Sequence, residues 1–140
     1  MILEELTAYI VATTSTSPPL AVGVNVFMHS FPATAADTAA CFYETGGTAP
    51  VESFGGVVAE APNVQVVARS DSYADARDLA QTVFNKMVAV KNVSLSSSTA
   101  AGTWYVSGHA QQSPFDIGDD ASGRPQISCN YRIQKEVSST

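Results

Sequence analysis

The chain has 140 residues, 45% of them hydrophobic and 14% charged, a composition typical of a compact folded domain and not of a disordered tail. Seven Lys and Arg stand against thirteen Asp and Glu, and the net charge of −6 argues against nonspecific binding to phosphate backbones. No apolar run approaches the roughly 18 residues that span a bilayer, and Glu4 and Glu5 stand where a secretory signal carries basic residues. We therefore expect neither a membrane protein nor export by that route.

The first part of the chain predicts a helix and then a strand. Apolar residues of segment 1–13 recur at helical spacing, and the Ser, Thr and Pro residues of segment 14–19 end that pattern. Segment 21–28 alternates in the manner of a strand with one buried face. The residues on that face would be Val22, Val24, Val26 and Met28.

The next segments predict two more strands separated by a projecting element. Segment 38–44 alternates weakly, and the Gly46-Gly47 pair predicts a turn that ends this strand. Segment 48–62 has no sustained period, so it is either a long loop or a short hairpin projecting from the body, and it is a candidate contact element. Segment 63–69 resumes the alternation of a strand.

Segment 73–90 predicts the most clearly marked element, an amphipathic helix. Ser72 precedes Asp75 by three residues, a variant of the capping box. The opposite side of the segment is polar, so we expect the helix to lie across a sheet. The residues predicted to face that sheet are Ala76, Leu79, Ala80, Val83, Phe84, Met87 and Val88.

The last third of the chain predicts antiparallel strands. Segment 93–102 is rich in Ser, Thr and Ala, typical of a connection or a weak edge strand. Segments 103–110 and 126–137 alternate as strands, and an acidic, turn-rich loop over 113–125 joins them. The predicted fold class is therefore α+β, with a mostly antiparallel mixed β-sheet packed by two α-helices in a single domain.

The cysteines and histidines carry no recognisable catalytic or metal-binding pattern. Cys41 and Cys129 fall in predicted strands without the close spacing of a zinc site or redox pair, so we expect two buried free thiols in a reducing compartment. His29 and His109 have no second ligand at short helical spacing, and no phosphate-binding loop is present. No cofactor or metal is expected.

Three carboxylates near the end of the chain have several interpretations. Asp120 followed by Ser122-Gly123 favours a turn in which the carboxylate accepts backbone N–H groups, and Arg124 is placed to pair with one of the carboxylates. An interface or a cation site remains an alternative for Asp116, Asp119 and Asp120. The remote enzymatic alternative is a small hydrolase that uses these aspartates with His109.

The succession of motifs resembles the minor capsid and tail terminator family of long-tailed bacteriophages. The similarity runs in order through nearly the whole chain. The motifs that carry it are Asn25-Val-Phe-Met-His-Ser-Phe-Pro32, Tyr43-Glu-Thr-Gly-Gly47, Pro62-Asn-Val-Gln-Val-Val-Ala-Arg69, Tyr73-Ala-Asp-Ala-Arg77 and Gln112-Ser-Pro-Phe-Asp-Ile-Gly-Asp-Asp-Ala-Ser-Gly-Arg124.

The resemblance implies a non-enzymatic virion protein at the head-to-tail junction. Subunits of such a family would form a homohexameric ring that caps the tail tube, stops its polymerisation and meets the head-completion proteins, with DNA passing through the lumen without specific binding. Another neck component, a head-completion, tail-completion or minor capsid protein, is the alternative. The same resemblance gives the segment 114–124 an interfacial role without catalytic residues. The candidate interface residues are Arg69, Asp116, Asp119, Asp120, Arg124 and Arg132.

Overall fold

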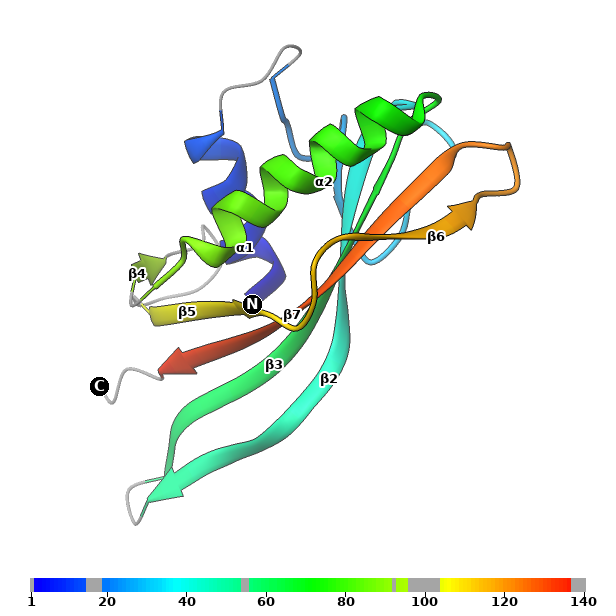
Figure 1. Cartoon of the computed structure of the whole chain (residues 1–140). Coiled ribbons are helices and arrows are strands. Elements are labelled where there is room, and N and C mark those ends of the chain that lie inside the picture. Colours follow the sequence, from blue (N-terminus) through cyan, green and yellow to red (C-terminus); the bar gives the residue numbers. More distant parts are fainter. Residues whose placement is uncertain (1, 15–18, 54–55, 92, 96–103, 137–140) are drawn as a thin grey trace.

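A computed structural model describes residues 2–14, 19–53, 56–91, 93–95 and 104–136 of the chain (Figure 1). These residues form two helices and seven strands, with three strands after the first helix and four after the second. Their bounds are α1 Ile2–Thr13, β1 Val26–Met28, β2 Ala39–Ser53, β3 Gly56–Arg69, α2 Tyr73–Val88, β4 Val93–Leu95, β5 Trp104–Ala110, β6 Phe115–Asp119 and β7 Pro125–Glu136.

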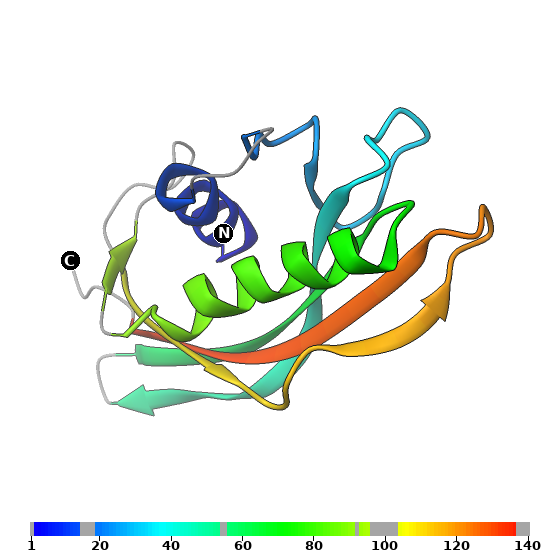
Figure 2. The same ribbon diagram turned by 45° about the horizontal axis from the view of Figure 1, so that its top comes forward.

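The strands form one mixed sheet in the order β1-β2-β3-β7-β5-β4, in which β6 also pairs with β7. Among the described strands β1 and β2 run parallel, and the other pairs are antiparallel. The strands β6 and β5 pair with successive parts of the same edge of β7. Both helices lie on one face of the sheet (Figure 2). The predicted α+β class is confirmed.

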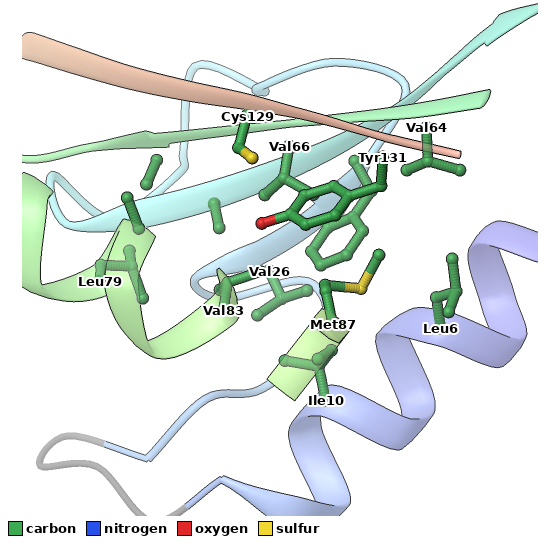
Figure 3. Close-up of a cluster of buried hydrophobic side chains, with 14 of the residues drawn as sticks. Leu6, Ile10, Val26, Val64, Val66, Leu79, Val83, Met87, Cys129 and Tyr131 are labelled. Carbon is green, nitrogen blue, oxygen red and sulfur yellow. The ribbon is translucent and has the colours of Figure 1, made fainter. Parts of the chain in front are cut away.

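The main core lies between the helices and this face of the sheet. Leu6 and Ile10 of α1 and Met87 of α2 are fully buried there together with Phe42 and Tyr131 from the sheet. Figure 3 shows Leu6 and Ile10 of α1 and Met87 of α2 on one side of the cluster, with Tyr131 of the sheet at its centre. Both helices therefore depend on tertiary packing, as amphipathic helices generally do.

The helix α2 matches the predicted amphipathic pattern with differences at its ends. Five of the seven predicted residues are buried, while Phe84 and Val88 are half-buried. Ser72 stands at the N-cap position but its side chain makes no capping hydrogen bond, so the predicted capping box is not formed. The helix ends at Val88, two residues earlier than predicted.

The predicted strand over 21–28 is wrong in its first five residues. Gly23 has φ of +88°, and the Ala21 carbonyl accepts hydrogen bonds from the N–H groups of Val24, Asn25 and Val26. This is a tight turn, and the Asn25 side-chain oxygen closes it by accepting the Ala21 N–H at 2.7 Å. Because the turn breaks the alternation, Val22 and Val24 are exposed and only 26–28 is a strand.

The predicted end of a strand at Gly46-Gly47 is also wrong. β2 continues through this pair with a register shift between Glu44 and Gly46, which is a β-bulge and not a turn. Of the two alternatives for segment 48–62, the structure has a hairpin and no long loop, because Thr48 pairs with Ala61 and Ser53 with Gly56. β2 and β3 thus extend beyond the rest of the sheet as a two-stranded arm (Figure 1).

The last third of the chain contains the strand β4, in the segment for which the sequence predicts a connection or a weak edge strand. β4 covers 93–95 and pairs with β5, while the remainder of that prediction, 96–102, lies outside the described residues. β7 spans Pro125–Glu136, close to the predicted strand over 126–137. In the part of the chain that is described, no helix is long and apolar enough to cross a bilayer.

A second, smaller cluster lies on the face of the sheet opposite the helices. Phe27 and Cys41 are buried there, and the segment between β1 and β2 covers them with Phe31, whose ring centroid is 6.2 Å from that of Phe27. This covering segment also contributes Asp37 to a network of ion pairs.

Candidate protein–protein interface

The acidic segment 113–125, predicted as a loop, contains the strand β6. Phe115 pairs with Ser128 and Asp116 with Ile127, so this segment and β7 form a hairpin with its turn at 120–124. The sequence pattern missed the strand because all five of its residues are exposed and a bulge at Gly118 interrupts the alternation. A strand without a buried face leaves no hydrophobic period to detect.

The turn itself has the chemistry that the sequence predicts. One oxygen of Asp120, Oδ1, accepts the backbone N–H groups of Ser122 and Arg124, each at 2.9 Å, and Gly123 has φ of +80°. The other oxygen, Oδ2, accepts Arg124 Nε at 2.9 Å. The N–H groups of Arg124 and Ser122 together with the Arg124 guanidinium hold the pKa of the Asp120 carboxyl below its usual range.

Two arginines and two aspartates meet at this turn, and we call them the charged cluster: Asp37, Arg69, Asp120 and Arg124. Arg124 Nη1 lies 3.1 Å from Asp37 Oδ1, in the segment between β1 and β2. Arg69 Nη1 lies 3.8 Å from Asp120 Oδ2, and Arg69 Nη2 donates to the Ala36 carbonyl at 3.2 Å. The charged cluster therefore joins the β6–β7 turn, the end of β3 and the segment before β2.

Arg69 is the least accessible member of the cluster. It is 5% exposed, and its guanidinium carbon lies 4.1 Å from the centroid of the Phe31 ring, in cation–π geometry. Burial and the nearby Arg124 lower the pKa of Arg69, while Asp120 and Asp37 act in the opposite direction. Arg69 is thus bound within its own subunit, where it fixes the position of the hairpin.

The structure brings together only some of the six candidate residues. Arg69, Asp120 and Arg124 are in contact, and Asp116 and Asp119 lie close by on exposed β6. Asp116 Oδ1 accepts the Gly118 N–H at 2.8 Å, which closes the bulge. Arg132 lies apart from them, exposed in the second half of β7 opposite Asn63 and His109.

Sequence reasoning missed two residues of this site, Asp37 and Phe31. Asp37 is 87 residues from its partner Arg124, and no local spacing connects them. Phe31 stands in a segment without regular structure, where a pattern gives no indication of its stacking on Arg69.

The enzymatic alternative is not supported by this arrangement. His109 is opposite Arg132 and Asp116 is opposite Ile127, so five residues of β7, about 17 Å, separate them. Arg132 and Ile127 also point to different faces of the sheet, because they differ by an odd number of positions. Across the described ranges, no three acidic, histidine or cysteine side chains are close enough to hold a metal ion.

β6 also presents a free edge and exposed apolar side chains. Within the described residues it pairs with β7 alone, and Phe115 and Ile117 are 39% and 43% exposed. An open edge with apolar side chains is a site where another chain is able to add. The hairpin held by the charged cluster is therefore the candidate interface.

Comparison with protein-family models gives a match over nearly the whole chain. No curated protein matches the chain significantly. Residues 6–137 match the sequence model of the family described as bacteriophage tail terminator protein, and this match runs from within α1 to the end of β7. The chain thus belongs to the bacteriophage tail terminator protein family, whose members are structural components of the virion that interact with the tail tube and are not enzymes.

Proposed function

We propose that the protein forms a homohexameric ring on the head-proximal end of the tail tube, at the head-to-tail junction of the virion. The ring stops polymerisation of the tube and presents its other side to the head-completion proteins. The observation that carries this proposal is the family match over 6–137. Before assembly the subunits are in the host cytoplasm.

The surfaces of the subunit support ring formation. A closed ring needs two different surfaces per subunit that meet head to tail. The free edge of β6, with Phe115 and Ile117, supplies an accessible one, and Asp116 and Asp119 are exposed beside it. Arg132, exposed in the second half of β7, is available to a second contact.

The arm formed by β2 and β3 is the proposed contact with the tube or the head. Its strands stay paired from Thr48–Ala61 to Ser53–Gly56. They extend beyond the described part of β7, whose last pair with β3 is Glu136–Ala59. An element that reaches past the body of the subunit suits a contact between successive layers of an assembly.

The charge of the subunit supports passage of DNA through the lumen. Each subunit has a net charge of −6, so the ring would repel phosphates overall. The release of counterions, which drives the binding of basic proteins to DNA, would not hold the DNA in the lumen. A basic ring of the same shape would instead bind the DNA and slow its exit.

The proposal is tested by adding the purified protein to polymerising tail tube protein. Light scattering gives the mass of the free protein, and negative-stain images show the ends of the tubes. We expect rings, free or at one end of each tube, and tubes that stop growing. Tubes that grow unchanged and carry no additional density at either end would contradict the proposal. Binding to isolated heads in place of tubes would favour the neck alternative, a head-completion protein.

A further inference from the structure

The first half of α2 borders a groove with a cavity volume of about 430 Å³. We call it the acidic groove. It is lined among others by Leu20, Val24, Asp75, Asp78, Leu79 and Thr82. One wall is the turn before β1, the other is the side of α2 that carries the two aspartates. The groove therefore combines an apolar floor with two carboxylates.

Hydrogen bonds within the subunit fix the turn that forms one wall of the groove. Asn25 is 5% exposed, accepts the Ala21 N–H and donates to the Pro19 carbonyl at 3.2 Å. Val24 is fixed by the hydrogen bond from Ala36 N–H to its carbonyl, yet its side chain is 58% exposed. An apolar side chain held in solvent by a rigid turn has no role in the core of the subunit, and it is available to a partner.

The two carboxylates of the groove are available as well. Within the described residues no Lys or Arg side chain forms an ion pair with Asp75 or Asp78, in contrast to Asp120 and Asp37. A partner that enters this groove should therefore offer a positive charge next to an apolar or aromatic group.

The opposite side of the same helix offers that combination, and we call it the arginine flank: Tyr73 and Arg77. These residues are four apart and share a side, while Asp75 lies two residues from each and faces away from them. Tyr73 is 50% exposed, and the Arg77 guanidinium carbon lies 6.0 Å from the centroid of its ring. Arg77 Nη1 donates to the Pro114 carbonyl at 3.0 Å, which directs it towards β6.

The acidic groove and the arginine flank therefore lie on different sides of α2. Figure 2 shows the helix running between the segment before β2 on one side and β6 on the other. One surface is apolar and negative, and the other is aromatic and positive, so the two are complementary. Complementary surfaces at two different places on one subunit give a head-to-tail contact that propagates from copy to copy.

We propose that the acidic groove of one copy binds Tyr73 and Arg77 of the next copy in the ring. The aromatic ring would lie on Val24 and Leu79, and the guanidinium would pair with Asp75 and Asp78. This inference rests on the proposed ring and specifies one of its interfaces.

Charge reversal on the two sides tests the contact. Asp75→Lys alters the groove, Arg77→Glu alters the flank, and the double variant exchanges the two charges. Asn85→Lys, on the exposed side of α2 that belongs to neither surface, is the matched control. Val24→Ser is a second groove variant that changes no charge at a side chain already exposed. Thermal unfolding verifies that each variant is folded, and light scattering and negative-stain images on tubes measure ring formation.

Each single reversal should weaken ring formation by about tenfold or more, and the double variant should restore it. Val24→Ser should weaken it, and Asn85→Lys should leave it unchanged. A mixture of the two single variants should also form rings, in which the two variants alternate, because each contact between unlike subunits then pairs opposite charges. Normal rings from folded single variants, or a double variant no better than either single one, would overturn the inference while leaving the proposed function intact. A wild-type protein that forms no ring even on tubes would contradict both.

Discussion

At the scale of single residues, the carboxylate of Asp120 binds three kinds of partner: backbone N–H groups of the turn, Arg124 and Arg69. Its Oδ1 accepts two backbone N–H groups of the turn, and its Oδ2 lies within 2.9 Å of Arg124 Nε and 3.8 Å of Arg69 Nη1. Because all these interactions favour the ionised form, the pKa of Asp120 is lowered and its charge contributes to stability.

The sign of this contribution gives a pH dependence for Asp120→Asn. A lowered pKa in the folded state means stabilisation that is complete above the unfolded pKa of about 3.9 and is lost as the pH falls through the folded value. We expect the variant to melt below the wild type at pH 7, and the gap in melting temperature to shrink below about pH 4. Asp119→Asn, at an exposed residue outside the charged cluster, is the control. An equal difference in melting temperature at pH 7 and below about pH 4 would contradict a stabilising role of the ionised Asp120 carboxylate.

The two free cysteines give a second prediction at this scale. Cys41 and Cys129 are buried and unpaired with each other, and burial raises the pKa of both thiols. Since the thiolate is the reactive form, a thiol reagent at pH 8 should modify the folded protein on the order of 100-fold more slowly than the urea-unfolded chain. Reducing agent should leave the melting temperature unchanged. Rapid modification of the native protein would show that the strands open around these residues.

The sequence predicts the contacts between residues that are close in the chain, and it does not predict those between distant residues. Asp120, Gly123 and Arg124 stand within five residues, and their residue types alone indicate a turn with an ion pair. Arg69 and Asp37 join them only after β3 and the segment before β2 fold against the hairpin. No rule of spacing links residues that depend on tertiary structure for their contact.

At the scale of elements, α2 is the part of the fold whose stability follows most directly from its pattern. Met87 lies on the side of α2 that faces the sheet and is fully buried, and Gln81 lies on the other side and is exposed. Met87→Ala should lower the free energy of unfolding by about 2 to 5 kcal/mol through lost burial and a cavity. Gln81→Ala should change it by less than about 0.5 kcal/mol. Urea denaturation measures both, and similar values for the two would mean that this face of α2 is not packed as described.

The junction between the end of α2 and β5 gives a further prediction. The Gly108 N–H donates to the Val90 carbonyl at 2.7 Å, and a Cβ at Gly108 would lie 2.7 Å from the Met87 carbonyl oxygen. Gly108→Ala should therefore push β5 and the helix end apart and cost about 1 to 3 kcal/mol of unfolding free energy. Gln134→Ala, at an exposed position of β7, should be nearly neutral in the same denaturation experiment. If Gly108→Ala leaves the free energy of unfolding unchanged, β5 and the end of α2 move apart at little cost.

Elements with a buried face were predictable, and elements without one were not. α2 and β7 carry long periodic patterns because each covers the core. β6 has no buried residue, and the turn over 21–25 carries valines at strand-like spacing although it is not a strand. Both exceptions lie on surfaces that we assign to contacts, as expected where a sequence serves a partner and not its own core.

At the scale of the whole molecule, the net charge of −6 predicts how the protein behaves with DNA. We expect no retardation of duplex DNA by the protein in an electrophoretic assay even at about 50 mM salt, where nonspecific binding is strongest. A shift that disappears on raising the salt would show a basic surface large enough to override the net charge, and it would contradict free passage of DNA.

The position of β7 has a consequence for when the subunit becomes competent to assemble. β7 lies between β3 and β5, although it follows both of them along the chain. Until this strand has been synthesised, β3 lacks one of its two neighbours, and Lys135 cannot reach its buried partner Glu5 in α1, 130 residues away. Contacts this distant in sequence form late during folding. A chain whose β7 has not yet been synthesised therefore also lacks the β6–β7 hairpin, the surface that we assign to contact with other subunits.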